Sequence, residues 1–363
     1  MMLKYTTLIG LVIALSGCLR PGEDRARLDL TIGKASEEGL TIDVDQGHAA
    51  VRSLTSGEVE LWAQAPVLTM ELQAEVDGEW RITLLNGMAA SVLEGADGQG
   101  PVEVSRLEQP RPTAQVWSVT LRAGEVTTLR YAPPGADEEM PFRYAVLSDI
   151  QRAVDDVGEI FTRMNEDETL LFVVSAGDLV SQGHGSELRR FQREMEALNI
   201  PLYATPGNHE RGVDEIPWSQ IFGRGSFNWQ FQGACFTFAD SSAATIDPMV
   251  YDWMQGWLDS CRERSHAFLT HVPPIDPVGA RSGGWRSRKE AAKLFTMLGR
   301  GKVDVAYYGH VHSFYSFSNG TVDAFISGGG GAIPERLDGI GRHYLVVETD
   351  HTRVRQVGVV RVD

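Results

Sequence analysis

The stretch FRYAVLSDIQ at residues 142–151 decides the fold, because the apolar run 144–147 leads directly into Ser148, Asp149 and Gln151. Three later runs repeat this pattern. Continuous apolar runs that end at polar residues are typical of strands buried on both faces of a sheet. The later runs are 170–174, 267–269 and 303–308.

Helix-like stretches separate these runs, which predicts an α/β layered domain. In open α/β sheets, ligands bind at the carboxyl ends of the strands. The polar motifs that follow the apolar runs are therefore candidates for a binding or catalytic site. The helix-like stretches are 157–165, 186–198, 249–264 and 286–298.

Five strand-end motifs supply side chains of the kind that bind metals. One of them alone would be weak evidence, since a single histidine at a strand end is usually only hydrogen-bonded. Five in succession, each after a predicted strand, indicate a metal site. The motifs are Ser148-Asp149-Ile150-Gln151, Ala176-Gly177-Asp178, Gly207-Asn208-His209-Glu210, Thr270-His271-Val272-Pro273 and Gly309-His310-Val311-His312.

This set resembles the calcineurin-like metallophosphoesterase superfamily over about residues 142–363, and the glycine run 328–331 resembles the family's glycine-rich loop. The resemblance implies a four-layer fold of two packed β-sheets flanked by helices. It also implies hydrolysis of phosphate mono- or diesters by a hydroxide that bridges two metal ions of the Mn, Fe or Zn type.

The resemblance further implies a division of the ligands between the two metals. The first metal would take Asp149, Asp178 and His312, and the second would take Asp178, Asn208, His271 and His310. Asp178 would bridge the pair. His209 matches a histidine that binds no metal and instead stabilises the phosphate or protonates the leaving oxygen.

Two positions depart from related patterns. Gln151 stands where the family has a histidine, so it is either a substitute ligand at a weaker first site, or that site fills only with substrate. Purple acid phosphatases carry a metal-binding tyrosine after the shared aspartate. Here Asp178 is followed by 179–182, Leu-Val-Ser-Gln, which does not imply that cofactor.

Three further side chains are candidates for substrate contact. Arg281 and Arg286 follow His271 in a glycine-containing loop, and arginine suits phosphate because its guanidinium binds in a bidentate manner. His184 follows the second motif. For each of them, an ordinary solvated loop residue is an equally good interpretation.

Before this domain, residues 28–132 alternate apolar and polar residues in short runs, such as LDLTI at 28–32, broken by turns. Period-two alternation predicts antiparallel strands in a small β-sandwich-like domain. No motif there indicates chemistry, so a spacer or packing module is favoured. The proline- and glycine-containing stretch 133–141 is the expected linker.

Residues 1–17 are expected to be a lipoprotein signal peptide, because Lys4 precedes the apolar run 8–15. The following Leu15-Ser16-Gly17-Cys18 resembles a bacterial lipobox, which implies lipidation at Cys18, a tether over 18–27 and an extracytoplasmic, membrane-anchored protein.

With Cys18 assigned to lipidation, Cys235 and Cys261 remain. In an oxidising compartment they would pair, but two buried free thiols are nearly as good an interpretation.

The net charge of −16 argues against a large nucleic acid as partner, since binding there depends on Lys and Arg. A small phosphate ester remains compatible, because bound metals reverse the local field. Two functions stay open: a phosphoesterase, or a binding or scaffold lipoprotein whose phosphoesterase fold has lost turnover. The substrate and the oligomeric state do not follow from the sequence.

Overall fold

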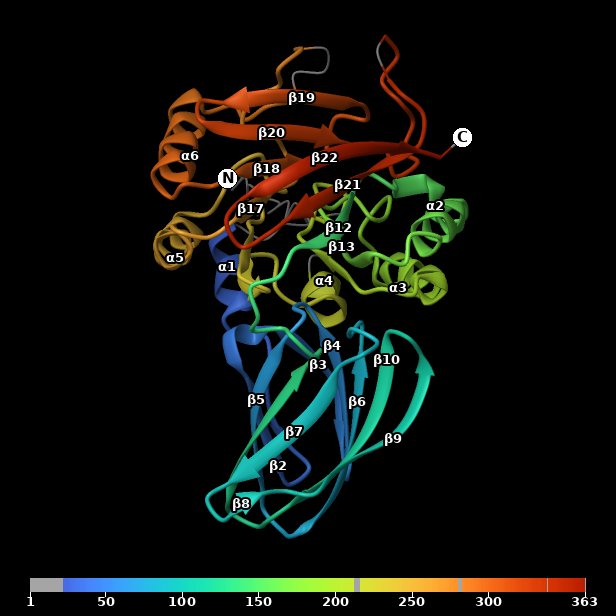
Figure 1. Cartoon of the computed structure of the whole chain (residues 1–363), viewed down its shortest axis with the longest axis vertical. Helices are drawn as coiled ribbons and strands as arrows, with labels where there is room; N and C mark the ends of the chain where they lie inside the picture. Colours follow the sequence, from blue (N-terminus) through green and yellow to red (C-terminus); the bar gives the residue numbers. More distant parts are fainter. Residues whose placement is uncertain (1–21, 212–215, 280–282, 338, 363) are drawn as a thin grey trace, which may run out of the picture.

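The computed structural model describes residues 22–211, 216–279, 283–337 and 339–362. It shows two β-rich parts, one above the other in Figure 1. Residues 1–17, predicted to be a signal peptide, and Cys18 lie outside the described residues. Among the described residues, no helix is both long and apolar enough to cross a bilayer.

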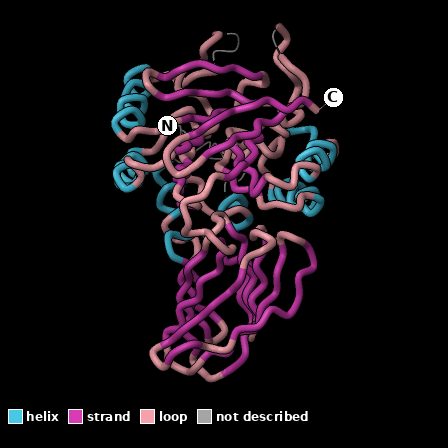
Figure 2. The backbone as a smooth tube through the Cα atoms, in the orientation of Figure 1, coloured by secondary structure: helices cyan, strands magenta, loops and turns pink. Residues whose placement is uncertain are grey.

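The first part is a sandwich of two sheets (Figure 2). The six-stranded sheet has the order β1-β2-β5-β11-β7-β8, with β1 (Lys34–Glu37), β2 (Leu40–Val44), β5 (Leu68–Ala74), β11 (Val126–Ala132), β7 (Val92–Asp97) and β8 (Gly100–Pro101). The five-stranded sheet has the order β3-β4-β6-β10-β9, with β3 (Ala49–Thr55), β4 (Glu58–Ala63), β6 (Gly78–Leu85), β10 (Ala114–Leu121) and β9 (Val104–Arg111). Inward-facing residues alternate with outward-facing ones, as in β6, because successive side chains of a strand point to opposite faces.

The second part holds two further sheets. One has the order β14-β13-β12-β21-β22, with β14 (Leu202–Ala204), β13 (Leu170–Ser175), β12 (Phe142–Leu147), β21 (His343–Thr349) and β22 (Val354–Arg361). The other has the order β15-β16-β17-β18-β20-β19, with β15 (Phe227–Phe231), β16 (Ala234–Phe238), β17 (His266–Leu269), β18 (Val305–Tyr308), β20 (Val322–Ser327) and β19 (Phe314–Asn319).

Helices cover the outer face of each of these sheets, on the two flanks of the upper part of Figure 1. On one side Ile160 and Phe161 pack with Val173 of β13, and on the other Leu294 packs with Ala306 of β18. The predicted four-layer α/β fold is thereby confirmed. The covering helices are α2 (Val157–Asn165), α3 (Gly185–Glu194), α5 (Pro248–Ser260) and α6 (Arg288–Arg300), whereas α4 (Ile216–Ile221) lies between α3 and β3 of the sandwich (Figure 1).

The N-terminal segment differs from the prediction of a tether followed by a strand. Gly22–Asp29 is a helix, α1, and the LDLTI stretch forms its last turn and the turn that follows. Ala26 is buried in the cluster around α5, and the Asp29 carboxylate accepts the backbone N–H groups of Gly225 and Ser226, each at 2.9 Å. This docking explains why the period-two pattern does not produce a strand here.

The sandwich and the second part of the chain are joined by buried polar side chains. Asn86 bonds to both backbone groups of Leu202, and the Gln64 amide bonds to both backbone groups of Arg224. A continuous hydrophobic cluster also extends from the sandwich into the space between the two sheets of the second part.

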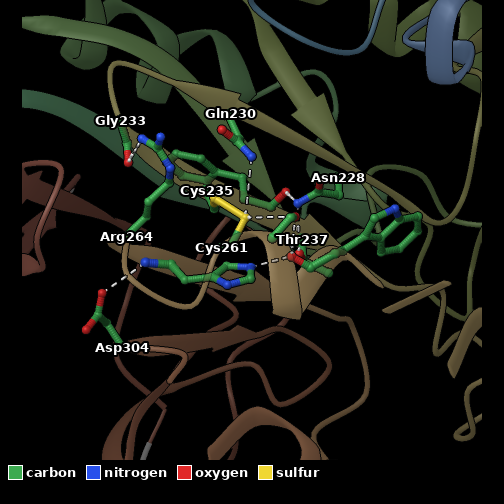
Figure 3. The surroundings of a disulfide bond; sticks show 12 residues. Asn228, Gln230, Gly233, Cys235, Thr237, Cys261, Arg264 and Asp304 are labelled. Atoms are coloured by element: carbon green, nitrogen blue, oxygen red, sulfur yellow. Dashed lines mark hydrogen bonds between the residues drawn. A yellow bond between two sulfur atoms is a disulfide. The ribbon is translucent and has the colours of Figure 1, made fainter. Parts of the chain in front are cut away.

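Cys235 of β16 and Cys261, at the end of α5, form a disulfide with a Cα–Cα distance of 6.1 Å (Figure 3). Both cysteines are buried. Of the two interpretations left open by the sequence, the structure has the disulfide.

Candidate metal centre

The carboxyl ends of β12 and β13 bring the first two motifs together. These strands are parallel neighbours, and the Asp149 N–H donates to the Gly177 carbonyl at 3.0 Å. Asp149, Gln151 and Asp178 all have positive φ, at 60°, 50° and 56°. Such conformations are uncommon outside glycine and concentrate at functional sites. They turn three polar side chains toward one point.

A first cluster forms around Gln151. Its Nε2 lies 2.9 Å from Asp178 Oδ2 and 3.1 Å from His312 Nε2, while His312 Nε2 lies 3.5 Å from Asp149 Oδ1. The other ring nitrogen of His312, Nδ1, is bonded to the Ile333 carbonyl at 2.7 Å. That bond fixes the ring so that Nε2 faces the carboxylates.

A second cluster forms around Asn208. Its Oδ1 lies 3.0 Å from His271 Nε2 and 2.7 Å from His310 Nδ1. His271 Nε2 also lies 3.3 Å from Asp178 Oδ2, and its Nδ1 is bonded to the Ala176 carbonyl. Asp178 therefore stands between the two clusters.

His209 lies beside Asp178 but is oriented differently from the other histidines. Its Nδ1 is bonded to the Ser181 carbonyl at 2.5 Å, which leaves Nε2 facing Asp178 Oδ2 at 3.8 Å. The side chain is 35% exposed, whereas that of His271 is fully buried. A half-exposed imidazole at this position can reach a substrate.

Glu210 ends the third motif and has a structural role that the motif pattern does not predict. Its buried carboxylate accepts the backbone N–H groups of Asp178 at 2.8 Å, Val180 at 3.1 Å and Gly207 at 2.7 Å. It thereby ties the second motif to the third. Burial raises the pKa of Glu210 to about 7. An acidic residue directly after the Asn-His pair is the only signal the sequence offers for this role.

Two glycines allow the ligands to approach the backbone. A Cβ atom on Gly309 would lie 2.5 Å from Asp149 Oδ2, and one on Gly207 would lie 2.1 Å from Asp178 Oδ1. Both distances are shorter than nonbonded atoms tolerate. The absence of a side chain at these positions is therefore a condition of the site, which a side chain would crowd.

The electrostatics of the cluster are those of closely packed acids and imidazoles. Burial and the neighbouring Asp178 carboxylate raise the pKa of Asp149, with His271 and His312 acting against this. Although burial works in the opposite direction, His271 and His209 hold the pKa of Asp178 well below its usual range. Asp178 in turn raises the pKa of His271 to about 9, against the effect of burial.

The donor set fits metal ions. Asp149, Asp178 and His271 offer ligand atoms that all lie within 4.8 Å of one another. Carboxylate, amide oxygen and imidazole together suit Mn, Fe or Zn better than Mg or Ca, which prefer oxygen ligands alone. The carbonyl partners of His271 and His312 are the outer contacts that metal-binding histidines normally make. The site is thus a candidate metal centre.

Of the three residues predicted to contact substrate, the structure places one next to the site. Arg281 lies outside the described residues, and Arg286 is exposed. His184 immediately precedes α3, where its backbone N–H faces the Glu187 carboxylate. The adjoining Gly183 packs against the carbonyls of His209 and Glu210, so His184 lies on a loop next to the site.

Residues 142–314 match the calcineurin-like phosphoesterase family. With the motif order and the four-layer fold, this match identifies residues 142–314 as a domain of the calcineurin-like metallophosphoesterase superfamily. The chain is also 25% identical over 150 residues to a 3′,5′-cyclic-nucleotide phosphodiesterase from Nostoc sp.. That match covers 39% of this chain and 55% of the relative, so the chain spans about half the length of the curated relative it matches.

Among solved structures, a purple acid phosphatase from yellow lupin seeds shares the fold. The TM-score is 0.52 at 14% identity, and the match covers 81% of this chain and 72% of that chain. GAP50, the anchor in the inner membrane complex of Plasmodium, matches with a TM-score of 0.47 at 13% identity, over 62% of this chain and 90% of that chain.

Proposed function

We propose that this chain is a metal-dependent phosphoesterase that hydrolyses phosphate mono- or diesters at a dinuclear centre. One observation carries the proposal. Asp178 Oδ2 lies 2.9 Å from Gln151 Nε2 in the first cluster and 3.3 Å from His271 Nε2 in the second. A carboxylate in this position is suited to bridge two ions of the Mn, Fe or Zn type.

The protein groups divide the remaining work. Asp149, Gln151 and His312 would hold one ion, and Asn208, His271 and His310 the other. Bound ions supply Lewis acidity, which activates water and stabilises charge on the transferring phosphoryl group. His209 is placed to stabilise the phosphate or to protonate the leaving oxygen, because its bond to the Ser181 carbonyl holds Nε2 toward the centre.

The test is hydrolysis of aryl phosphate mono- and diesters by the purified chain supplied with Mn, Fe or Zn. Asp178→Asn should lower turnover by at least about 100-fold, because it weakens both halves of the centre at once. Exposed Asp156 provides the control, and Asp156→Asn should leave turnover unchanged. Metal analysis should find about two ions per wild-type chain. Unchanged turnover in Asp178→Asn would contradict the assignment, and one ion or none without turnover would favour the binding lipoprotein.

We also propose that the chain acts outside the cytoplasm, held to a bacterial membrane by lipid at Cys18. The Cys235–Cys261 disulfide supports this location, because such bonds persist in oxidising compartments. The test is fractionation of cells that produce the full chain. Cys18→Ser should move the protein from the membrane fraction to the soluble one, and an unchanged distribution would rule the anchor out.

A further inference from the structure

We propose that the mouth of this centre binds phosphoesters that carry an apolar chain. The contact would be made by an apolar rim, defined as Ile275, Val278, Ile333 and Leu337. The inference rests on the proposed function, because it names the substrate class of the same site.

The rim is unusual in its exposure. Leu337 is 90% exposed, Ile333 75% and Val278 50%, and Ile275 is also exposed. Single exposed aliphatic residues are common on protein surfaces and need no explanation. Here four of them lie on only two loops, and both loops are bonded to or packed against the candidate metal ligands.

The first loop follows His271 and is held in shape by Asp276. Its Oδ1 accepts the N–H groups of Val278 at 3.0 Å and Gly279 at 2.8 Å, and its Oδ2 accepts that of Gly283 at 3.1 Å. Gly283 in turn packs against His310, since a Cβ there would lie 3.4 Å from the imidazole Cδ2. One carboxylate thus holds the backbone of Val278 and that of Gly283, the residue that packs against the second cluster.

The second loop is bonded directly to the first cluster. The Ile333 carbonyl accepts from His312 Nδ1 at 2.7 Å, and the Glu335 N–H donates to the His312 carbonyl at 2.9 Å. The backbone of Ile333 thus serves a candidate metal ligand while its side chain points into solvent. Leu337 follows two residues after Glu335.

Both loops extend from the end of the catalytic part that lies opposite the sandwich (Figure 1). An apolar chain attached to a phosphate in the centre would leave the site between them. The rim then offers it four aliphatic side chains without any change of fold.

Charge near the rim favours the phosphate end of such a molecule. The chain carries a net charge of −16, yet the segment that bears Ile275 and Val278 leads on to Arg286 and to Arg288, the first residue of α6, and both arginines are exposed. Arginines that follow aliphatic residues on one segment suit an anionic ester with an apolar chain better than a wholly polar phosphate ester.

Binding of two phosphonates to the metal-loaded full chain, measured by calorimetry, tests the proposal. Octylphosphonate should bind at least about tenfold more tightly than methylphosphonate, because partial burial of seven additional methylene groups contributes that much. Val278→Ser combined with Leu337→Ser should remove most of this preference. The control is Val92→Ser with Val126→Ser, two exposed valines on β7 and β11 of the sandwich, far from the centre.

Equal affinity for the two phosphonates, or no binding of octylphosphonate, would overturn the proposal, as would a rim variant that keeps the full preference. Because the measurement needs no turnover, it separates this inference from the proposed function. A chain that prefers octylphosphonate but hydrolyses no ester would retain the rim assignment and lose the enzyme assignment.

Discussion

Gln151 is the residue at which this centre departs from its family, and the structure gives the departure a geometric meaning. The amide turns its N–H₂ group toward Asp178 Oδ2 and His312 Nε2. In this orientation it satisfies a carboxylate rather than offering a lone pair. For Oε1 to bind a metal, the Gln151 amide group has to rotate by half a turn. The positions of O and N in such a group are assigned from the hydrogen bonds that it makes. An imidazole needs no such change.

We therefore expect Gln151→His to tighten metal binding in the first cluster by about tenfold or more, since neutral imidazole is the stronger donor to a transition metal. Competition with a chelator, followed by titration, measures the affinity of each site. His271→Ala serves as the comparison, because it should weaken the other site and leave the first less affected. No tightening in Gln151→His would place residue 151 outside the coordination sphere.

At the residue scale, the sequence predicts that the candidate ligands lie at strand ends, because each follows a buried apolar run. The carboxyl ends of neighbouring parallel strands meet at one edge, so Asp149 and Asp178 had to lie close together. The role of Glu210 could not be predicted in the same way. Its role depends on backbone N–H groups from two loops, those of Asp178 and Val180 after β13 and that of Gly207 after β14, and no spacing in the sequence predicts that they converge.

At the scale of single elements, hydrophobic periodicity predicted the helices correctly where the apolar face of the pattern is the face that packs on a sheet. The four helix-like stretches correspond to α2, α3, α5 and α6, and each helix buries one face on a sheet. The strand predicted at 28–32 from the alternating pattern LDLTI is wrong. The buried contacts of Ala26 and the backbone bonds accepted by Asp29 stabilise α1 instead, and tertiary contacts routinely override a short local pattern.

The disulfide illustrates a second limit at this scale. Cys235 and Cys261 are separated by 26 positions. Their pairing depends on where the end of α5 meets β16, which is a property of packing rather than of spacing. Figure 3 shows the bond beside Gln230 of β15, and it joins β16, the second strand of its sheet, to the end of α5.

At the scale of the whole molecule, the two parts behave as one packed unit. Aliphatic residues of the sandwich and aromatic residues between the two catalytic sheets belong to one hydrophobic cluster. The sequence suggested a spacer joined by a linker, because a linker can be recognised from Pro and Gly while an interface of this kind has no local signature. The sandwich contacts the strand that leads into the Asn208 loop, so it contributes to the scaffold of the centre.

A substitution at Asn86 tests whether the sandwich and the second part form one packed unit. It is buried, its Nδ2 donates to the carbonyls of Ala63 and Leu202, each at 2.8 Å, and its Oδ1 accepts the Leu202 N–H at 2.9 Å. Asn86→Ala leaves these groups buried without partners and should lower the free energy of unfolding by about 2–4 kcal/mol. Urea unfolding followed by circular dichroism measures the change.

Gln109→Ala provides the control, because that exposed amide bonds only within the sandwich, to the carbonyls of Ala89 and Pro112. It should cost less than about 1 kcal/mol. If the two parts form one unit, wild type and Asn86→Ala should each unfold in a single transition that tryptophan fluorescence and circular dichroism report at the same urea concentration. Two separated transitions in the wild type would show instead that the sandwich is an independent spacer. The loss of unfolding free energy in Asn86→Ala would then be confined to the transition in which the sandwich unfolds.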